Sequence, residues 1–205
     1  MEKTAETEEQ VRPQGRPRDE AVRRKILGAA LTLLEDAGFA RVTCGAIAKR
    51  AGTSSATVYR WWPNKAAVLI DAFAESIAPE LPVPDVPTLA EYVRVQLRQF
   101  SKVLVGRNGR LRAALIAAAQ DDPEVAAAFV SHWVEPRRAL ARKSLRRYQN
   151  DGQLPADFDI DLVLDAMYGP LHFLLMVRHG KPNQDYADDI ASLLLRGFMP
   201  REDER

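Results

Sequence analysis

The segment from Thr43 to Pro63 limits the fold most strongly, because it leaves room for only two very short helices. Thr43 and Ser54 are residue types that accept a hydrogen bond from the free backbone N–H groups at a helix start. Gly52 favours the left-handed backbone that ends the first helix, and Pro63 disfavours helical geometry at the residue before it. The segment therefore predicts two short helices joined by a tight turn.

Longer amphipathic helices are predicted on both sides of this segment. Apolar residues repeat on one helical face from Asp19 to Ala37, and Gly38 can end that helix. Asn64 can cap the helix that follows the segment. Further helices are predicted at residues 88–105, 108–120, 122–149, 159–178 and 184–198. Because no strand pair is evident, the predicted fold class is all-α, with about nine helices.

A proline-rich connector divides the chain, since four of the nine residues 79–87 are proline and such segments are extended. We expect a helix-turn-helix domain at residues 19–78, with its motif at 43–62, and a second helical domain at 79–205. Residues 1–18 are polar and without periodicity, which is typical of a flexible basic arm. The arm either contacts a nucleic acid, by entering a minor groove or by screening phosphates, or is an unstructured tail.

Positive charge is concentrated near the N-terminus. The formal net charge is only +1, yet the stretch from Arg12 to Lys65 holds eleven Lys and Arg against four Asp and Glu. A basic N-terminal third on a mildly acidic body favours a surface that binds a polyanion. A solvated helical surface with uneven charge would give the same distribution, so charge alone does not decide between the two.

The chain has the features of a cytoplasmic protein with no membrane partner. No apolar run approaches the roughly 20 residues that span a bilayer, and the acidic first residues lack the apolar core of a signal peptide. The single cysteine, Cys44, excludes an intrachain disulfide and is expected to be a small packing residue rather than a redox sensor.

The run TCGAIAKRAGTSSATVYRWWPNKAAVL, residues 43–69, resembles the DNA-binding motif of the TetR family of transcriptional regulators. That family typically shows a threonine, Ile-Ala, Ala-Gly, a Ser-x-Gly/Ala-Thr-Leu/Val-Tyr helix, an aromatic pair and a lysine that opens the next helix. About ten spaced positions agree between residues 24 and 73, so the pattern is specific. The rest of the chain resembles the family only in the number and order of its helices.

The resemblance implies a set of DNA-contacting residues: Thr43, Ser54, Ser55, Ala56, Thr57, Tyr59, Trp61 and Lys65. The short side chains at 55–57 would face base edges, and the aromatic ones at 59 and 61 would reach phosphate or sugar. Positions 43 and 65 would bind phosphate at helix starts. Two positions depart from the family: Gly45 stands where some members have a base-reading arginine, and the tryptophan at 61 replaces the usual His or Tyr.

A second candidate site lies in the C-terminal domain. Its aromatic residues are spaced as either a plain core or a cavity wall, and periodicity does not separate the two. The resemblance favours a cavity for a small apolar effector, located between the connector and the last two helices, that moves the DNA-binding heads. The predicted lining residues are Phe100, Phe129, Trp133, Tyr168 and His172. The alanine-rich helix 108–120 is expected to slide when the effector binds.

The last two helices, at 159–178 and 184–198, predict a homodimer. The first is apolar nearly all round and the second adds a further apolar face, which is more than one subunit needs to bury. Two such helices from each chain can form a four-helix interface about a two-fold axis, with Leu194 in it.

The sequence thus predicts a DNA-binding regulator, a repressor of operator DNA that a small ligand releases. No enzymatic reaction, cofactor or metal is expected, because nucleotide-binding and nucleophile motifs are absent and the three histidines lack metal-ligand spacing. Three alternatives stay open: a ligand-independent regulator that responds to a protein partner, a small helical enzyme with an incidental helix-turn-helix, and a nonspecific architectural DNA-binding protein.

Overall fold

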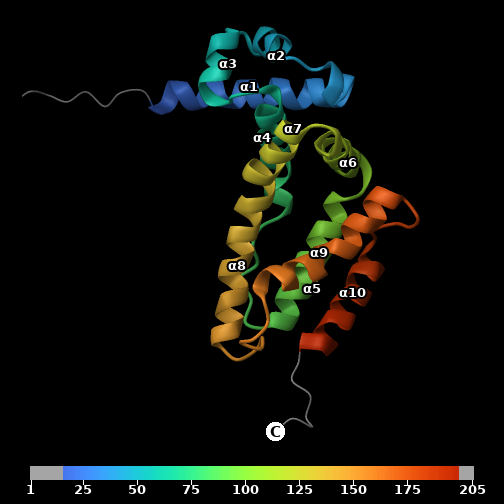
Figure 1. The fold of residues 1–205 in the computed structure, drawn as a ribbon. Coiled ribbons are helices and arrows are strands. Elements are labelled where there is room, and N and C mark those ends of the chain that lie inside the picture. The colour runs from blue at the N-terminus through green and yellow to red at the C-terminus, as the bar shows by residue number, and fades with distance from the viewer. Residues whose placement is uncertain (1–15, 199–205) are drawn as a thin grey trace, which may run out of the picture.

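Helix caps fix the N-terminal part of the molecule, which we call the head (Figure 1). In the computed structural model, which describes residues 16–198, the head consists of α1 (Arg16–Ala37), a 3-10 turn (Phe39–Arg41), α2 (Cys44–Ala51), α3 (Ser55–Trp61) and α4 (Lys65–Ile77). Thr43, Ser54 and Asn64 each accept a backbone N–H bond at the start of a helix. Gly52 ends α2 with φ of 68°. The predicted starts and ends of these short helices are therefore confirmed.

The first helix begins earlier than predicted, at Arg16 instead of Asp19, so the end of the predicted arm is helical. Residues 1–15, which hold the rest of that arm, lie outside the described part of the chain. α1 packs against α2 and α4, and the two short helices lie side by side on it (Figure 1). The hydrophobic core of the head consists of fully buried side chains: Ile26, Leu34, Ile47, Val58, Trp62 and Phe73.

The remaining helices form the part that we call the body. After a short 3-10 turn (Ala78–Glu80) and an extended connector, they are α5 (Leu89–Val103), α6 (Gly106–Asp121), α7 (Pro123–Phe129), α8 (Glu135–Asn150), α9 (Ile160–Val177) and α10 (Gln184–Phe198). α4 runs from the head into the body, where α7 packs against it (Figure 1). No strand occurs within residues 16–198, so the predicted all-α fold is confirmed.

A π-helical turn, Val130–Val134, joins α7 to α8 without a break, so the predicted helix 122–149 is one continuous rod with a local widening. Pro136 has no backbone N–H and cannot bond to the carbonyl of His132, which accounts for an irregular turn at this point. Two other boundaries differ from prediction by about two residues, since α5 ends at Val103 and α6 begins at Gly106.

One described helix, α9, has the length and apolar composition of a membrane span, which the sequence analysis did not anticipate. Within the fold, however, α9 packs against α5, α6, α8 and α10. Two of its carboxylates, those of Asp161 and Asp165, form ion pairs with Arg138 of α8. These contacts show that α9 is packed among other helices of the protein. One apolar face of α9 is left exposed.

The turn between α5 and α6 depends on the absence of a side chain at Gly109. A Cβ atom there would lie 1.9 Å from the carbonyl oxygen of Leu104, a backbone atom that cannot easily move away. At Gly28, in the middle of α1, a Cβ atom would meet nothing within 4 Å. The two glycines are therefore a matched pair, one sterically required and one replaceable.

We expect Gly109→Ala to lower the free energy of unfolding by about 1–3 kcal/mol, because the turn must open to accept the methyl group. Gly28→Ala should raise it by about 0.5–1 kcal/mol, since alanine loses less backbone entropy in a helix. Urea unfolding followed by circular dichroism measures both. Equal stability of the two variants would mean that the turn does not need a glycine.

Candidate DNA interface and ligand pocket

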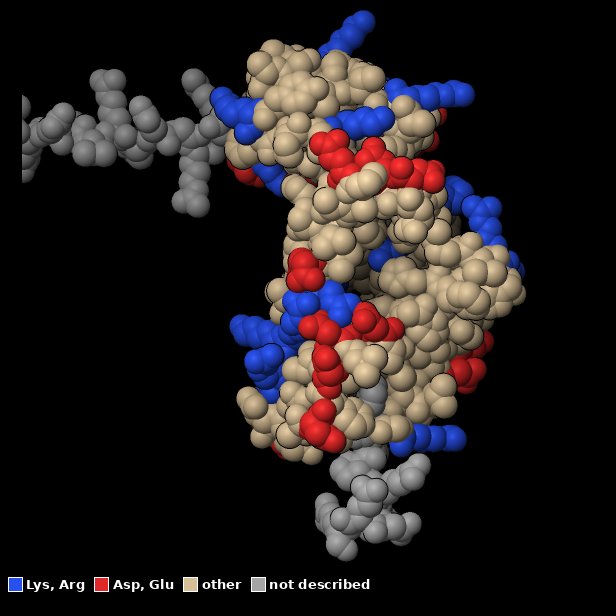
Figure 2. All heavy atoms as spheres, in the orientation of Figure 1, with Lys and Arg blue, Asp and Glu red and all other residues tan. Residues whose placement is uncertain are grey.

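The helix α3 exposes most of the side chains that the sequence assigns to DNA. Ser54, Ser55 and Ala56 are exposed at its start, and Tyr59 and Trp61 are 55% and 37% exposed further along. Val58 and Trp62 point into the core of the head and are 0% and 2% exposed. In Figure 2 lysine and arginine side chains project from the surface of the head, while acidic ones gather where it meets the body.

The starts of α2 and α3 lie close together. A Cβ atom on Gly45 would be 3.9 Å from the Thr43 hydroxyl oxygen and 4.0 Å from that of Ser55. The Ser54 hydroxyl accepts a bond from the Thr57 backbone N–H at 3.2 Å and lies 2.9 Å from the Thr57 hydroxyl. Thr57 is half-buried, and both its backbone N–H and its hydroxyl lie within hydrogen-bond distance of the Ser54 side chain. Ser55 is exposed, so its side chain is accessible to a bound molecule.

Two other residues of the predicted DNA-contacting set, Lys65 and Tyr59, form bonds within the head. The ammonium group of Lys65 donates to the carbonyl oxygens of Phe39 and Ala40 at 3.3 and 3.4 Å, and it lies 4.8 Å from the centre of the Phe39 ring. A hydrogen bond with the Cys44 thiol raises the pKa of Tyr59. Lys65 therefore ties the loop before α2 to the start of α4, and a phosphate role for it stays a prediction.

A chain of hydrogen bonds that the sequence did not predict links the head to the body. Trp62 ends α3, and its Nε1 donates to Oδ2 of Asp71 on α4 at 2.7 Å. The other oxygen of Asp71 lies 2.7 Å from Nδ1 of His132, in the π-helical turn. A second link joins the Asn64 amide to Glu124 of α7 at 2.9 Å. The only signal in the sequence is a lone aspartate inside the apolar helix α4.

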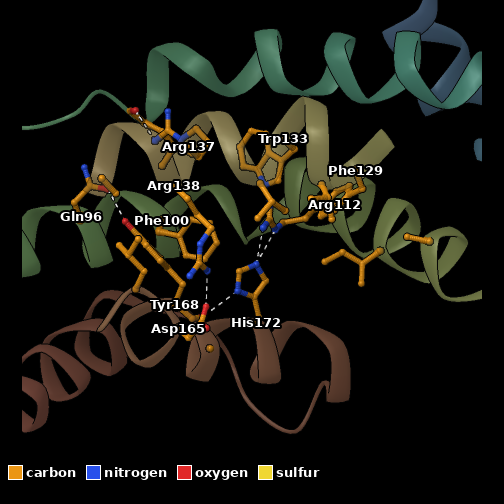
Figure 3. Close-up of a pocket in the computed structure, with 18 of the residues that line it drawn as sticks. Gln96, Phe100, Arg112, Phe129, Trp133, Arg137, Arg138, Asp165, Tyr168 and His172 are labelled. Carbon is orange, nitrogen blue, oxygen red and sulfur yellow. Dashed lines mark hydrogen bonds and ion pairs between the residues drawn. The ribbon is translucent and has the colours of Figure 1, made fainter. Parts of the chain in front are cut away.

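The body contains a cavity of about 560 Å³ (Figure 3). It is lined by residues of the connector and of α5, α6, α7, the π-helical turn, α8 and α9. All five residues that the sequence assigns to a ligand line this cavity: Phe100, Phe129, Trp133, Tyr168 and His172. The structure thus brings them together from four separate segments, and we call this cavity the pocket.

An arginine that the sequence analysis missed lies in the pocket wall. Arg112 of α6 is only 4% exposed, and its guanidinium carbon lies 5.2, 5.7 and 4.9 Å from the ring centres of Phe100, Phe129 and Trp133. Its Nε donates to Nε2 of His172 at 3.2 Å. The signal in the sequence is weak: Arg112, Ile116 and Ala119 share one face of α6 at helical spacing.

Burial shifts the pKa values of both partners. Burial, and then the charge of Arg112, lower the pKa of His172 to about 4, so its imidazole is neutral at pH 7. Nδ1 of His172 lies 2.9 Å from the carbonyl oxygen of Tyr168, and it therefore carries the proton. Nε2 is left as the acceptor for Arg112. Burial, and then the charge of Arg137, lower the pKa of Arg112 to about 9.

Three other polar side chains of the wall, those of Tyr168, Gln96 and Arg137, are bonded within the protein. The Tyr168 hydroxyl donates to Oε1 of Gln96 at 2.8 Å, and Gln96 donates to the carbonyl of Pro82 at 3.3 Å. Arg137 donates to the carbonyl of Leu81 at 2.9 Å. Among the described residues, no group of three or more His, Cys, Asp and Glu is placed to hold a metal ion.

An uncovered apolar face runs along α9 and α10. Its exposed side chains are Leu162, Phe173, Met176, Val177 and Leu193. Leu193 is the most exposed of them at 71%, whereas Leu194, which the sequence analysis places in the interface, is half-buried against the core. The amphipathic pattern identifies both helices but not the face of α10 that points outward.

Comparison with known sequences gives matches along most of the chain. A profile described as bacterial regulatory proteins of the tetR family matches residues 26–72, and one described as a tetracyclin repressor-like C-terminal domain matches residues 83–194. The uncharacterized HTH-type transcriptional regulator YdeS of Bacillus subtilis (strain 168) is 35% identical over 185 residues, which is 90% of this chain and 93% of that protein.

Solved structures share the whole fold. The TetR family transcription regulator SCO0332 is 31% identical with a TM-score of 0.76, and the match covers 87% of this chain and 99% of that one. The flavonoid-responsive regulator FrrA is 26% identical with a TM-score of 0.64, over 87% of this chain and 95% of that one. The similarity therefore extends through both the head and the body.

Proposed function

The chain belongs to the TetR family of helix-turn-helix transcriptional regulators, and from that premise we propose that it is a repressor that a small molecule in the pocket releases from its operator. Regulators of this family bind operator DNA, act as dimers and are not enzymes, and DNA binding places their work in the cytoplasm. The observation that carries the proposal is the hydrogen-bonded link from Trp62 through Asp71 to His132, which lies in the π-helical turn beside the lining residue Trp133.

The exposed start of α3 supports direct reading of DNA bases. A recognition helix places its first residues against base edges in the major groove, where short side chains allow close approach. Ser55 and Ala56 are exposed at this point, and Tyr59 and Trp61 follow at positions suited to phosphate or sugar. A DNA-binding protein of this kind gains its sequence specificity from base contacts near Ser55. It gains its general affinity from the aromatic and basic residues around that position.

The uncovered face of α9 and α10 supports a homodimer of this chain. Exposed leucine, phenylalanine, methionine and valine side chains lie along both helices, and such a patch marks an interaction surface in a water-soluble protein. Pairing α9 and α10 with the same two helices of a second copy would cover the patch by a four-helix contact with two-fold symmetry. Two heads would then be available for two half-sites about one helical turn apart.

The contacts around Trp133 support control by a ligand. Trp133 lines the pocket, and its ring centre lies 5.6 Å from that of Phe73 on α4. The residue before it, His132, is bonded to Asp71 of the same helix. A ligand that pushes on the π-helical turn would therefore move α4, which carries the head. Such a ligand shifts the equilibrium between two positions of the head only by the difference between its affinities for the two states of the protein.

α6 is less free to slide than the sequence analysis expected. Arg107 at its start is ion-paired with Glu35 of α1, and Asn108 donates to Glu80 at 3.1 Å. Gly109 is in close contact with the backbone of Leu104. We therefore assign the movement to the π-helical turn and α4 rather than to α6.

For DNA reading, we expect Tyr59→Phe and Ser55→Ala to have different effects, although each removes one hydroxyl group. Tyr59→Phe should weaken binding about fivefold on every sequence, because a phosphate contact carries no sequence information. Ser55→Ala should change the preferred base pair at one position. Selection of genomic fragments by the wild-type protein, followed by binding curves for both variants, measures this. Equal affinity of the wild-type protein for selected and random DNA would contradict specific regulation.

For the dimer, we expect Leu193→Asp to give monomers at micromolar concentration and to weaken operator binding, because it places a charge in an apolar interface. The matched control is Leu140→Asp on α8, a leucine that is 49% exposed but lies away from the uncovered face. That variant should stay dimeric. Sedimentation velocity distinguishes the two variants. A Leu193→Asp protein that stays dimeric would show that another surface forms the interface.

For ligand control, we expect His132→Leu to bind operator DNA nearly as the wild-type protein does but to need about tenfold more ligand for release. The substitution removes the bond to Asp71 and leaves the Trp62–Asp71 bond in place. Ser131→Ala, a change in the same π-helical turn at a hydroxyl that bonds only to carbonyls of its own helix, serves as the control. The measured quantity is the concentration of a releasing metabolite that halves operator occupancy. Unchanged release in His132→Leu would exclude this link as the route.

A further inference from the structure

The pocket holds a buried positive charge that no carboxylate within residues 16–198 neutralises. Arg112 is 4% exposed, and its Nη1 atom has no hydrogen-bond partner among the described residues. Asp165, the acidic residue that lines the pocket, is already ion-paired with Arg138. Buried charges in proteins are normally paired, because an unpaired charge loses its hydration without compensation.

The neighbours of Arg112 fix its position without neutralising it. The neutral His172 accepts from Nε and from Nη2, so it holds one edge of the guanidinium group and leaves Nη1 unbonded. Phe100, Phe129 and Trp133 attract the cation through their ring faces but offer no acceptor for an N–H group. Figure 3 shows Arg112 between Trp133 and Phe129, with its guanidinium directed toward His172.

A purely structural role explains this arrangement poorly. A neutral side chain could link α6 to His172 without burying a charge, and replacing a buried charge by an apolar group is often neutral or stabilising. Arg137 adds a second positive charge to the same wall, with a backbone carbonyl as its partner, and it makes the site still more positive. The free Nη1 is therefore a donor for which the described part of the protein supplies no acceptor.

We propose that the pocket binds a small carboxylate with an apolar body, and that Nη1 of Arg112 donates to its carboxylate group. A planar carboxylate matches the planar donors of a guanidinium, and the aromatic walls match an apolar body. A volume of about 560 Å³ suits a molecule of the size of a common metabolite. The inference rests on the ligand-responsive part of the proposed function, and it replaces the predicted apolar effector by an amphipathic anion.

The test uses two probes that differ only in their head group, anthracene-2-carboxylate and anthracene-2-carboxamide. Each probe is titrated into the whole chain in the absence of DNA, and binding is followed by the change in the fluorescence of the probe. The wild-type protein should bind the carboxylate about ten- to a hundredfold more tightly, because a charge-assisted hydrogen bond is lost with the amide. Equal binding of the two probes, tighter binding of the amide, or no binding of either would overturn the proposal.

The variant Arg112→Met should bind both probes with similar affinity. It should also melt at the same or a higher temperature than the wild-type protein, whereas loss of a structural arginine would lower the melting temperature. If this variant does not fold, Arg112→Gln, which keeps a hydrogen-bond donor without the charge, replaces it. Retained preference for the carboxylate in a folded variant would overturn the role of Arg112.

The control is the double variant Arg98→Met/Asp188→Asn, at an ion pair between α5 and α10 whose residues do not line the pocket. It removes an arginine together with its carboxylate partner and leaves the net charge unchanged. Its preference for the carboxylate should stay within about threefold of the wild-type value, since this exposed pair is already neutral. Because DNA takes no part in these titrations, a protein that fails to bind an operator can still show the preference, and the two proposals fail independently.

Discussion

Asp71 connects the two halves of the molecule, and the position of the head depends on it. Its carboxylate is bonded on one side to the indole of Trp62, at the end of α3, and on the other to His132 of the body. It lies on α4 within a run of apolar residues, 66–74, most of which are buried. A polar group in this environment needs its partners, so the angle between the recognition helix and the body is constrained by hydrogen bonds rather than by apolar packing alone.

The π-helical turn places this bond beside the pocket. Consecutive residues of the turn serve different parts of the molecule, since His132 is bonded to α4 and Trp133 faces the cavity. Pro136, which cannot complete the regular helical bonding pattern, accounts for the irregular geometry at this point. Under the proposed function, a change in the shape of the pocket would therefore reach the head through one turn of helix, without a long pathway through the body.

Arg112 shows how a site can escape a sequence analysis that finds its other members. The aromatic residues of the pocket stand out because large apolar side chains at helical spacing are expected to be buried. An arginine in an alanine-rich helix is expected on the surface, where most arginines lie. Its burial results from the packing of α6 against α7 and α9, and its lack of a carboxylate partner depends on which residues these other helices place beside it.

The sequence by itself determined the boundaries of the short capped helices of the head, the all-α class and the location of the helix-turn-helix. These features depend on caps such as Thr43, Ser54 and Gly52, whose hydrogen bonds and backbone angles involve residues only a few positions away. The tertiary structure alone decided that the aromatic residues enclose a cavity, that Leu193 rather than Leu194 faces outward, and that Asp71 meets His132. Each of these depends on how faces of distant helices meet, and a periodic pattern marks a face without naming its partner.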